Sequence, residues 1–324
     1  MVNVMSLEGI HVDVHADAAA LPPCPDAPLP SDCCGSGCSP CVHDLYQKDL
    51  EDWKQLCRNL RDGSVICDSF SNDTIGSARH IFPHKYTAFQ LISIEKITTD
   101  SYLYSFKIDN NGSLNLKVGQ HIISQLIRDD GKPISRQYTP VSEMDAVGRF
   151  EVIIKLYENG RMSQLIKKWK VGDMILWRGP FGTFSYSRNT CKRIILVGAG
   201  TGIAPLYQVI RFVLSDGDDE TQMNLMYASR SFSEIILRNE LLDLTNYWNF
   251  FMCHYLSNES NRLGKKYREN VEFRKITKDD VKNEIQKSCL VGTKLLICGT
   301  KSFNKDMINC SRDLDLLESQ VFTF

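Results

Sequence analysis

A strand, a glycine-rich turn and a helix in direct succession constrain this chain more than any other feature. The apolar run Ile194–Val197 is followed by Gly198, Gly200 and Gly202 and then by a helical pattern over Pro205–Leu214. Glycines let a backbone approach a phosphate closely, and a helix N-terminus attracts an anion. The third glycine of the G-x-G-x-x-G fingerprint would fall on Ile203, so this is not the Rossmann sequence itself. The pattern predicts a pyrophosphate-binding turn in a parallel α/β sheet.

The residues after this turn continue the alternation of strands and helices. Three further strands are expected at Met223–Ala228, Phe250–Tyr255 and Leu295–Cys298, with a helix over Phe232–Thr245. Such alternation is typical of a wound parallel sheet. We therefore predict an α/β domain over residues 189–324 for a pyridine nucleotide.

The preceding region, residues 80–188, has a different pattern of apolar and polar residues. Short apolar segments are separated by Gly, Asp and Asn, with one helical interlude at Ser163–Trp169, which predicts an antiparallel Greek-key β-barrel. The expected strands are Tyr86–Thr98, Tyr102–Ile108, His121–Ile127, Gln137–Val141, Phe150–Tyr157 and Asp173–Trp177. The fold class is thus mixed β and α/β, a barrel followed by a wound sheet.

The N-terminal region is poor in periodic apolar residues. Proline-rich residues 1–30 predict a disordered lead-in, and residues 31–79 form a small Cys-rich segment and linker with one helix over Asp44–Leu60. Cys33, Cys38 and Cys41 have the spacing of an iron–sulfur loop, with Cys57 or Cys67 as the fourth ligand. Zinc held by Cys34, Cys38, Cys41 and His43 is an alternative, and free thiols in a docking element are the third. No metal is assigned.

Composition excludes several classes of protein. The 324 residues carry a formal net charge of −1, which gives no basis for nucleic-acid binding. No apolar run reaches the roughly 18 residues of a membrane span, and residues 1–20 lack the basic, apolar pattern of a signal peptide. An intracellular, cytoplasmic protein is expected. Peripheral membrane association and the oligomeric state are left open.

The segment Arg136–Ser142 concentrates groups suited to a nucleotide. Arg136 and Tyr138 share one face of a predicted strand, because strand side chains repeat every second residue. A guanidinium can hold a phosphate while a phenol ring lies against a flat heterocycle. An ordinary strand with a surface arginine and a core tyrosine is the competing interpretation.

Arg136-Gln137-Tyr138-Thr139-Pro140-Val141-Ser142 resembles the FAD signature of the ferredoxin reductase-like flavoproteins, in the form found in NADH-cytochrome b5 reductases. The resemblance implies that Arg136 binds the flavin pyrophosphate and that Tyr138, beside Gln137, lies along the isoalloxazine. It implies that the Thr139 hydroxyl lies near flavin N5, the atom that accepts hydride.

A second segment extends the resemblance. Gly160, Arg161, Met162 and Ser163 match the family's second FAD segment with Arg for Lys, although Ser163 alone could be a helix N-cap. Upstream, Ile153 and Lys155 lie in a stretch similar to the strand that lines the flavin and the nicotinamide nucleotide. A spacer that animal relatives have between these two segments is missing here.

The glycine turn and the C-terminal region carry the remaining resemblance. Gly200, Thr201, Gly202 and Pro205 match the pyridine-nucleotide turn of the superfamily, which implies that Thr201 lies between flavin and nicotinamide. Cys298-Gly299 resembles the family's Cys-Gly motif beside nicotinamide C4, but Thr300 follows where the family has proline. The aromatic terminus ending in Phe324 also matches. The implied catalytic residues are Thr139, Thr201 and Cys298.

These matches imply FAD and NADH as cofactors. Arg230 follows the second wound strand, where NADPH users place a cation for the extra phosphate, so NADPH is the alternative. The Cys-rich segment resembles an oxidoreductase-like N-terminal module fused to some cytochrome b5 reductase-like proteins.

The resemblance thus implies an FAD-dependent NADH reductase that passes single electrons to a haem acceptor protein such as cytochrome b5. A reductase feeding an Fe–S partner or oxygenase, and a flavin-free docking scaffold, are the rival hypotheses.

Overall fold

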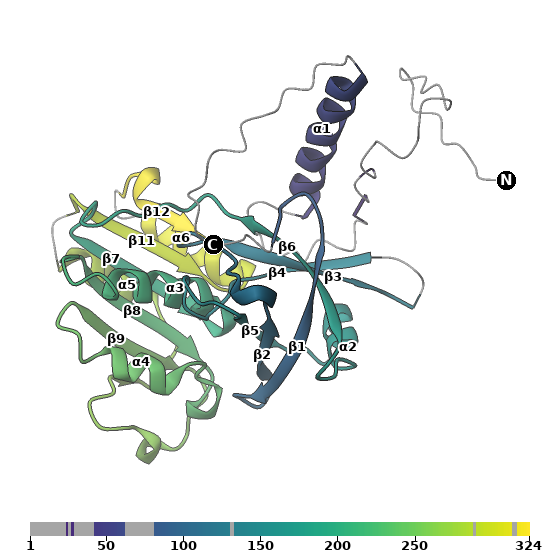
Figure 1. Cartoon of the computed structure of the whole chain (residues 1–324). Helices are drawn as coiled ribbons and strands as arrows, with labels where there is room; N and C mark the ends of the chain where they lie inside the picture. Colours follow the sequence, from purple (N-terminus) through teal and green to yellow (C-terminus); the bar gives the residue numbers. More distant parts are fainter. Residues whose placement is uncertain are drawn as a thin grey trace. The chain divides into compact units, whose positions relative to one another are not determined.

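The computed structural model describes residues 24, 27–28, 42–61, 81–129, 133–287, 290–312 and 316–324 (Figure 1). Helix α1 (Val42–Arg61) belongs to one compact unit and all other elements to a second. The helix expected over Asp44–Leu60 is confirmed. The cysteines from Cys33 to Cys41 lie outside the described residues, and so does the region linking α1 to the rest of the chain.

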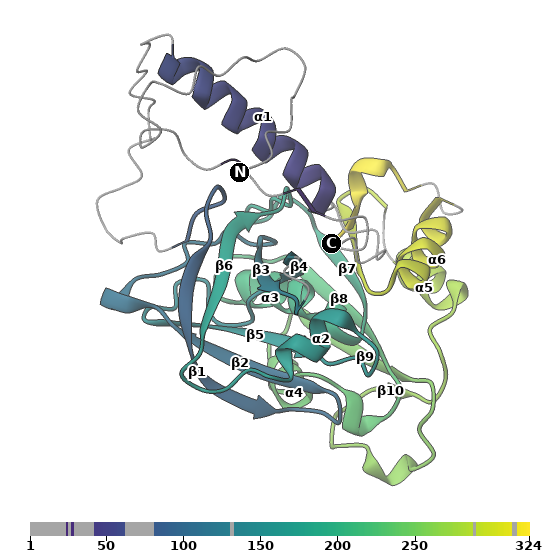
Figure 2. The same cartoon turned by 90° about the vertical axis from the view of Figure 1, so that its right-hand side faces the viewer.

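The first part of the second unit is an antiparallel sheet of six strands in the order β4-β3-β6-β1-β2-β5. Figure 2 shows β1 and β6 side by side. The strands are β1 (Thr87–Lys96), β2 (Ser101–Lys107), β3 (His121–Ile127), β4 (Pro133–Tyr138), β5 (Arg149–Lys155) and β6 (Met174–Phe181). A bridge between Pro140 and Val152 links the end of β4 to β5, so the two outer strands meet and the sheet closes into the expected barrel.

Aromatic side chains fill this barrel. Phe106 stacks on Phe150 with ring centroids 5.0 Å apart, and Trp177 meets both rings edge-on. Alternation along each strand explains the arrangement, because every second side chain of a half-buried strand points inward. Trp177 also contacts the ring of Tyr138, so this packing reaches the strand that carries the expected flavin motif.

The second part is a parallel sheet in the order β10-β9-β8-β7-β11-β12. Its strands are β7 (Arg193–Ala199), β8 (Gln222–Ser229), β9 (Phe250–Leu256), β10 (Val271–Glu272), β11 (Thr293–Cys298) and β12 (Val321–Thr323), and its helices are α3 (Ile203–Leu214), α4 (Arg238–Leu244), α5 (Lys278–Gln286) and α6 (Lys301–Arg312). Short 3-10 turns occur at η2 (Asp109–Asn111), η3 (Gly200–Gly202), η4 (Phe232–Glu234), η5 (Arg262–Gly264) and η6 (Glu318–Gln320). The predicted fold class is confirmed.

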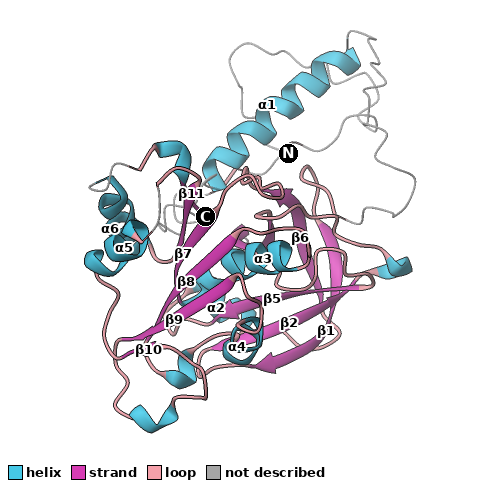
Figure 3. Ribbon diagram, turned by 90° about the vertical axis from the view of Figure 1, so that its left-hand side faces the viewer, coloured by secondary structure: helices cyan, strands magenta, loops and turns pink. Residues whose placement is uncertain are grey.

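Helices cover both faces of the parallel sheet (Figure 3). Ile194 and Leu196 pack into a core that includes α3 and α4, whereas Ile195 and Val197 pack into a core that includes α5 and α6. A strand buried on both faces is apolar throughout, which is why the run Ile194–Val197 stands out in the sequence.

The first of these cores extends beyond the α/β sheet. Val118, Val141, Ile153 and Phe184, from the barrel and the segment that follows it, are buried in the same cluster as the apolar residues of α3. The barrel and the parallel sheet therefore share one hydrophobic core.

Several expected boundaries are wrong. The strand placed at Gln137–Val141 is β4, which ends at Tyr138. The helix placed at Ser163–Trp169 is α2 (Arg161–Ile166). The helix expected over Phe232–Thr245 is divided into η4 and α4, because Leu237 takes a left-handed conformation with φ 57°. A helix cannot continue through such a residue.

Candidate functional site

The expected flavin motif lies at the end of β4. Arg136, Gln137 and Tyr138 pair with Ser124, Ile123 and Ile122 of β3, so Arg136 and Tyr138 leave the same face of the strand. Arg136 donates to the carbonyl of Ser135 at 2.7 Å. The Tyr138 ring stands edge-on to Trp177 at 5.7 Å, and burial raises the pKa of its phenol, which stays neutral. The motif thus offers a cation and a fixed neutral ring on one face.

Thr139 lies between β4 and β5. The backbone N–H of Val141 donates to the carbonyl of Glu151 at 2.9 Å, just past the Pro140–Val152 bridge. Proline has no N–H to continue a ladder, which explains why the regular strand stops before this point. Thr139 is therefore held against β5 by backbone contacts that follow it.

Strand β5 brings the two parts of the unit together. Ile153 is buried in the core shared with α3, and β5 is in contact with η3, which contains Thr201. Lys155 pairs with Asp100 at 2.9 Å and lies 3.8 Å from Glu234. The barrel motif and the glycine turn thus flank the same strand.

Two glycines of the turn differ in their surroundings: Gly200 faces open space, and Gly202 is in close contact with backbone. Gly200 has φ +56°, which favours glycine, and an added Cβ would meet nothing within 4 Å. A Cβ on Gly202 would instead collide with the backbone of Cys298 and Gly299. Tyr227 donates to the carbonyl of Gly200 at 2.9 Å. The turn can accept a pyrophosphate above Gly200, and Pro205 follows in the first turn of α3.

Cys298 lies next to this turn, since β11 pairs it with Gly198 of β7. Burial raises the pKa of its thiol to about 12, so the group is a neutral thiol and not a thiolate nucleophile. The chain terminus is tied to the same strand, because the Phe324 N–H donates to the carbonyl of Ile297 at 3.0 Å. Phe324 packs with Phe322 and Phe184 at centroid distances of 4.9 and 5.2 Å.

The second expected FAD segment opens α2. Gly160 is the N-cap, and Ser163 lies within the helix rather than capping it. The buried Ser163 hydroxyl accepts from the Tyr157 N–H at 3.0 Å. Arg161 is exposed and Met162 is buried in the barrel core. Ser163 therefore fixes the loop between β5 and α2.

Arg230 is engaged by carboxylates. It pairs with Asp100 at 3.3 Å and with Glu234 at 3.0 Å. Burial alone would raise the pKa of Glu234, but hydrogen bonds from Thr99 and Arg230 hold it below its usual range. Sequence reasoning identified Arg230 but missed Asp100 and Glu234, which have no motif of their own.

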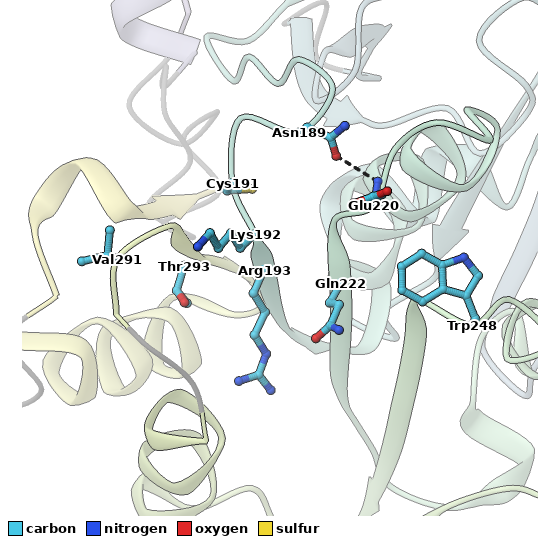
Figure 4. A pocket seen from close by; sticks show the side chains of 9 residues that line it. All are labelled: Asn189, Cys191, Lys192, Arg193, Glu220, Gln222, Trp248, Val291 and Thr293. Carbon is cyan, nitrogen blue, oxygen red and sulfur yellow. Dashed lines mark hydrogen bonds between the residues drawn. The ribbon is translucent and has the colours of Figure 1, made fainter.

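A pocket of about 670 Å³ lies at the opposite end of the parallel sheet. Arg193, Gln222 and Thr293, at the first residues of β7, β8 and β11, line it, and Figure 4 shows Trp248 and Val291 on opposite sides. Ligands of open α/β sheets bind outside the carboxyl ends of the strands. We therefore place the candidate site at the glycine turn and not in this pocket.

Three parts of the chain match known families. Residues 88–186 match the oxidoreductase FAD-binding domain, residues 196–309 the oxidoreductase NAD-binding domain, and residues 18–62 the N-terminal domain of oxidoreductase-like proteins. The chain is thus a flavoprotein oxidoreductase that binds FAD and a nicotinamide dinucleotide.

Curated relatives define the family. The chain is 37% identical over 302 residues to the NADH-cytochrome b5 reductase-like protein of Mus musculus, covering 93% of this chain and 95% of the relative. It is 33% identical over 251 residues to NADH-cytochrome b5 reductase 1 of Mortierella alpina, covering 75% and 82%. The chain belongs to the NADH-cytochrome b5 reductase family.

Solved structures share the fold. The cytochrome b5 reductase domain of Ulva prolifera nitrate reductase superposes with a TM-score of 0.66 at 24% identity, covering 76% of this chain and 100% of that one. The CS-b5R domains of human Ncb5or superpose with a TM-score of 0.64 at 23% identity, covering 78% and 71%.

Two further observations concern the described residues alone. No helix there combines the length and apolar character needed to cross a bilayer. No group of three or more His, Cys, Asp or Glu side chains in the described ranges is arranged to hold a metal ion.

Proposed function

We propose that the protein is an NADH-dependent FAD reductase that delivers single electrons to a haem acceptor of the cytochrome b5 type. The observation that carries the proposal is the position of β5 between the Tyr138–Thr139 segment and the glycine turn. Two flat rings bound to these segments would meet beside one strand. Bound FAD supplies the hydride-accepting atom and releases the two electrons one at a time.

The chain's own residues bind and orient. Arg136 holds the flavin pyrophosphate through its guanidinium, and the fixed ring of Tyr138 sets the plane of the isoalloxazine. Gln137, Gly160, Arg161, Met162 and Ser163 complete the flavin side, with Ile153 and Lys155 at the boundary. The Thr139 hydroxyl would lie near flavin N5, and Thr201 would lie between flavin and nicotinamide.

The nicotinamide side is shaped by backbone. Gly200 and Gly202 admit the pyrophosphate, and Pro205 begins the helix that supports it. The neutral Cys298 thiol and Gly299 give the nicotinamide an uncharged wall, while Phe324 closes the side next to β11.

The carboxylates around Arg230 favour NADH. Glu234 and Asp100 already pair with Arg230 and with Lys155, so the Arg230 guanidinium is not free to receive a 2′-phosphate. The adenosine ribose of NADH carries only a hydroxyl at that position, which a carboxylate can accept as a hydrogen bond.

The purified protein provides a direct test. Its visible spectrum should show bound flavin that NADH bleaches faster than NADPH, and the reduced protein should reduce cytochrome b5 faster than a ferredoxin-type Fe–S protein. Preferential transfer to the Fe–S protein would contradict the assigned acceptor. A protein without flavin absorbance would contradict the reductase itself.

A variant pair tests the flavin assignment. Arg136→Ala should lose about 10- to 100-fold in FAD affinity, because a charge-assisted hydrogen bond is removed. Arg149→Ala is the matched control, since Arg149 lies on β5 with its side chain 64% exposed. Equal FAD content in both variants would contradict the assignment of Arg136.

A further inference from the structure

Two polar side chains one turn apart on α3 reach the barrel. Gln208 is 4% exposed, and its Oε1 accepts from the Gly119 N–H at 2.6 Å while its Nε2 donates to the Gln120 carbonyl at 3.4 Å. Arg211 donates to the Val141 carbonyl at 3.3 Å and to Glu143 at 2.6 Å. One face of α3 thus makes four polar contacts with barrel loops.

These contacts flank the β3–β4 hairpin on both sides. Gly119 and Gln120 directly precede β3, and Val141 directly follows the Tyr138–Pro140 segment. The same helix begins at the glycine turn, since η3 runs into α3 without a break. The helix that carries the nicotinamide turn therefore holds both ends of the hairpin that carries the flavin motif.

Gly119 is closely packed at this contact. It has φ +81°, and an added Cβ would lie 2.5 Å from a Phe184 ring carbon. Its buried N–H needs a partner, because an unpaired buried donor is costly. Gln208 supplies that partner from the other part of the unit.

The polar pair lies beside an apolar layer. Val118, Val141 and Phe184 share a core with Leu206 and Tyr207 of α3. Apolar burial is non-directional and supplies attraction, whereas hydrogen bonds require a defined distance and angle. The apolar layer alone would hold the two parts together without fixing how they are turned relative to each other.

We propose that Gln208 and Arg211 are positioning residues for hydride transfer, which fix the flavin hairpin relative to the nicotinamide turn. This inference rests on the proposed function. Hydride transfer needs reacting atoms about 3–3.5 Å apart, and a displacement of about 1 Å can cost about 100-fold in rate. Neither side chain touches a reacting atom. They act through the loops that they hold.

Substitutions at Gln208 provide the test, with flavin reduction followed anaerobically by stopped flow at saturating NADH. Gln208→Leu should lower the limiting reduction rate by about 10- to 100-fold with FAD content and KM for NADH nearly unchanged. It should also weaken the long-wavelength charge-transfer absorbance of the reduced protein mixed with NAD⁺, an equilibrium signal of ring stacking. Gln208→Glu keeps the acceptor for Gly119 but loses the donor to Gln120, so it should restore only part of both signals.

Arg211 offers a second pair in case Gln208→Leu fails to fold. Arg211→Ala should lower the rate and the charge-transfer absorbance, and Arg211→Lys should retain more of both. Arg188→Ala is the matched control, because Arg188 also pairs with two loop carboxylates but lies 51% exposed and away from the barrel contacts.

The outcomes separate the two proposals. If the unsubstituted protein binds FAD that NADH does not reduce, the proposed function is wrong. If the unsubstituted protein reacts and the variants lose only thermal stability, with limiting rate and charge-transfer absorbance unchanged, the pair is merely structural and the positioning role is wrong.

Discussion

The two ends of the parallel sheet differ in what occupies them. At the carboxyl end, small residues leave backbone exposed, with open space above Gly200 and a close backbone contact at Gly202. At the amino end, Arg193 is buried in contacts with Glu284 and Asn224, next to a pocket of about 670 Å³. The difference teaches that a pocket in the protein surface need not be the functional site. Backbone geometry at the strand ends is the more informative feature.

The largest effect is expected at the amino end, on stability. Arg193→Ala removes one partner of a buried ion pair, which should lower the free energy of unfolding by about 3–5 kcal/mol, with Lys287 limiting the loss because it also pairs with Glu284. Denaturant unfolding measures the loss. The rate of flavin reduction by NADH per folded molecule should not change. If this rate fell together with the stability, the amino end would have a part in catalysis.

The next effect is expected at the carboxyl end, on activity. Gly202→Ala should lower kcat/KM for NADH by about 100-fold, since its Cβ displaces the Cys298 backbone. FAD content should be retained, because the barrel is not touched. Gly217→Ala is the matched control, as an added Cβ there meets nothing within 4 Å. Similar kinetics for the two variants would remove the contrast between the ends.

A smaller effect concerns cofactor choice at the carboxyl end. Glu234→Gln should raise the ratio of NADPH to NADH efficiency by about tenfold, because one negative charge near Arg230 is removed. Glu272→Gln is a control at a side chain 49% exposed that pairs with Arg274. Steady-state kinetics with both nucleotides measure the ratio, and an unchanged ratio would argue against Glu234 as the discriminating group.

The smallest effect is expected for the pocket itself. Trp248 is 66% exposed. Trp248→Ala should therefore change the rate of flavin reduction by less than about twofold and the free energy of unfolding by less than about 0.5 kcal/mol. Stopped-flow reduction and denaturant unfolding measure both quantities. A large loss of NADH binding would mean that the pocket holds the nucleotide.

Much of this architecture could be predicted from the sequence, because local patterns determined it. The apolar run before Gly198 and the two-residue alternation in the barrel required only neighbouring residues. The division of Phe232–Thr245 at Leu237 could not be predicted, since a leucine with positive φ is held by its tertiary surroundings.

The residues of the candidate site likewise fall into those that the sequence identified and those that it did not. Arg136, Tyr138, Gly200 and Cys298 were identified from motifs, but their assigned roles remain predictions. Gln208, Arg211, Asp100 and Glu234 were missed because each acts on residues distant in the sequence, and a single polar residue on a helix or loop carries no signal of its partner. Helices α5 and α6 were also missed, since each carries only a few apolar residues among mostly polar ones.

The shared core under α3 has a consequence for how such a protein can be divided. The two sheets look modular in sequence, yet Val118, Val141, Ile153 and Phe184 are buried against residues of the other half. Either half expressed by itself would present this apolar surface to water, which favours aggregation. Heating the intact unit should accordingly give one cooperative melting transition for both halves. The boundary between the two sheets would therefore be a poor point at which to divide or recombine the chain.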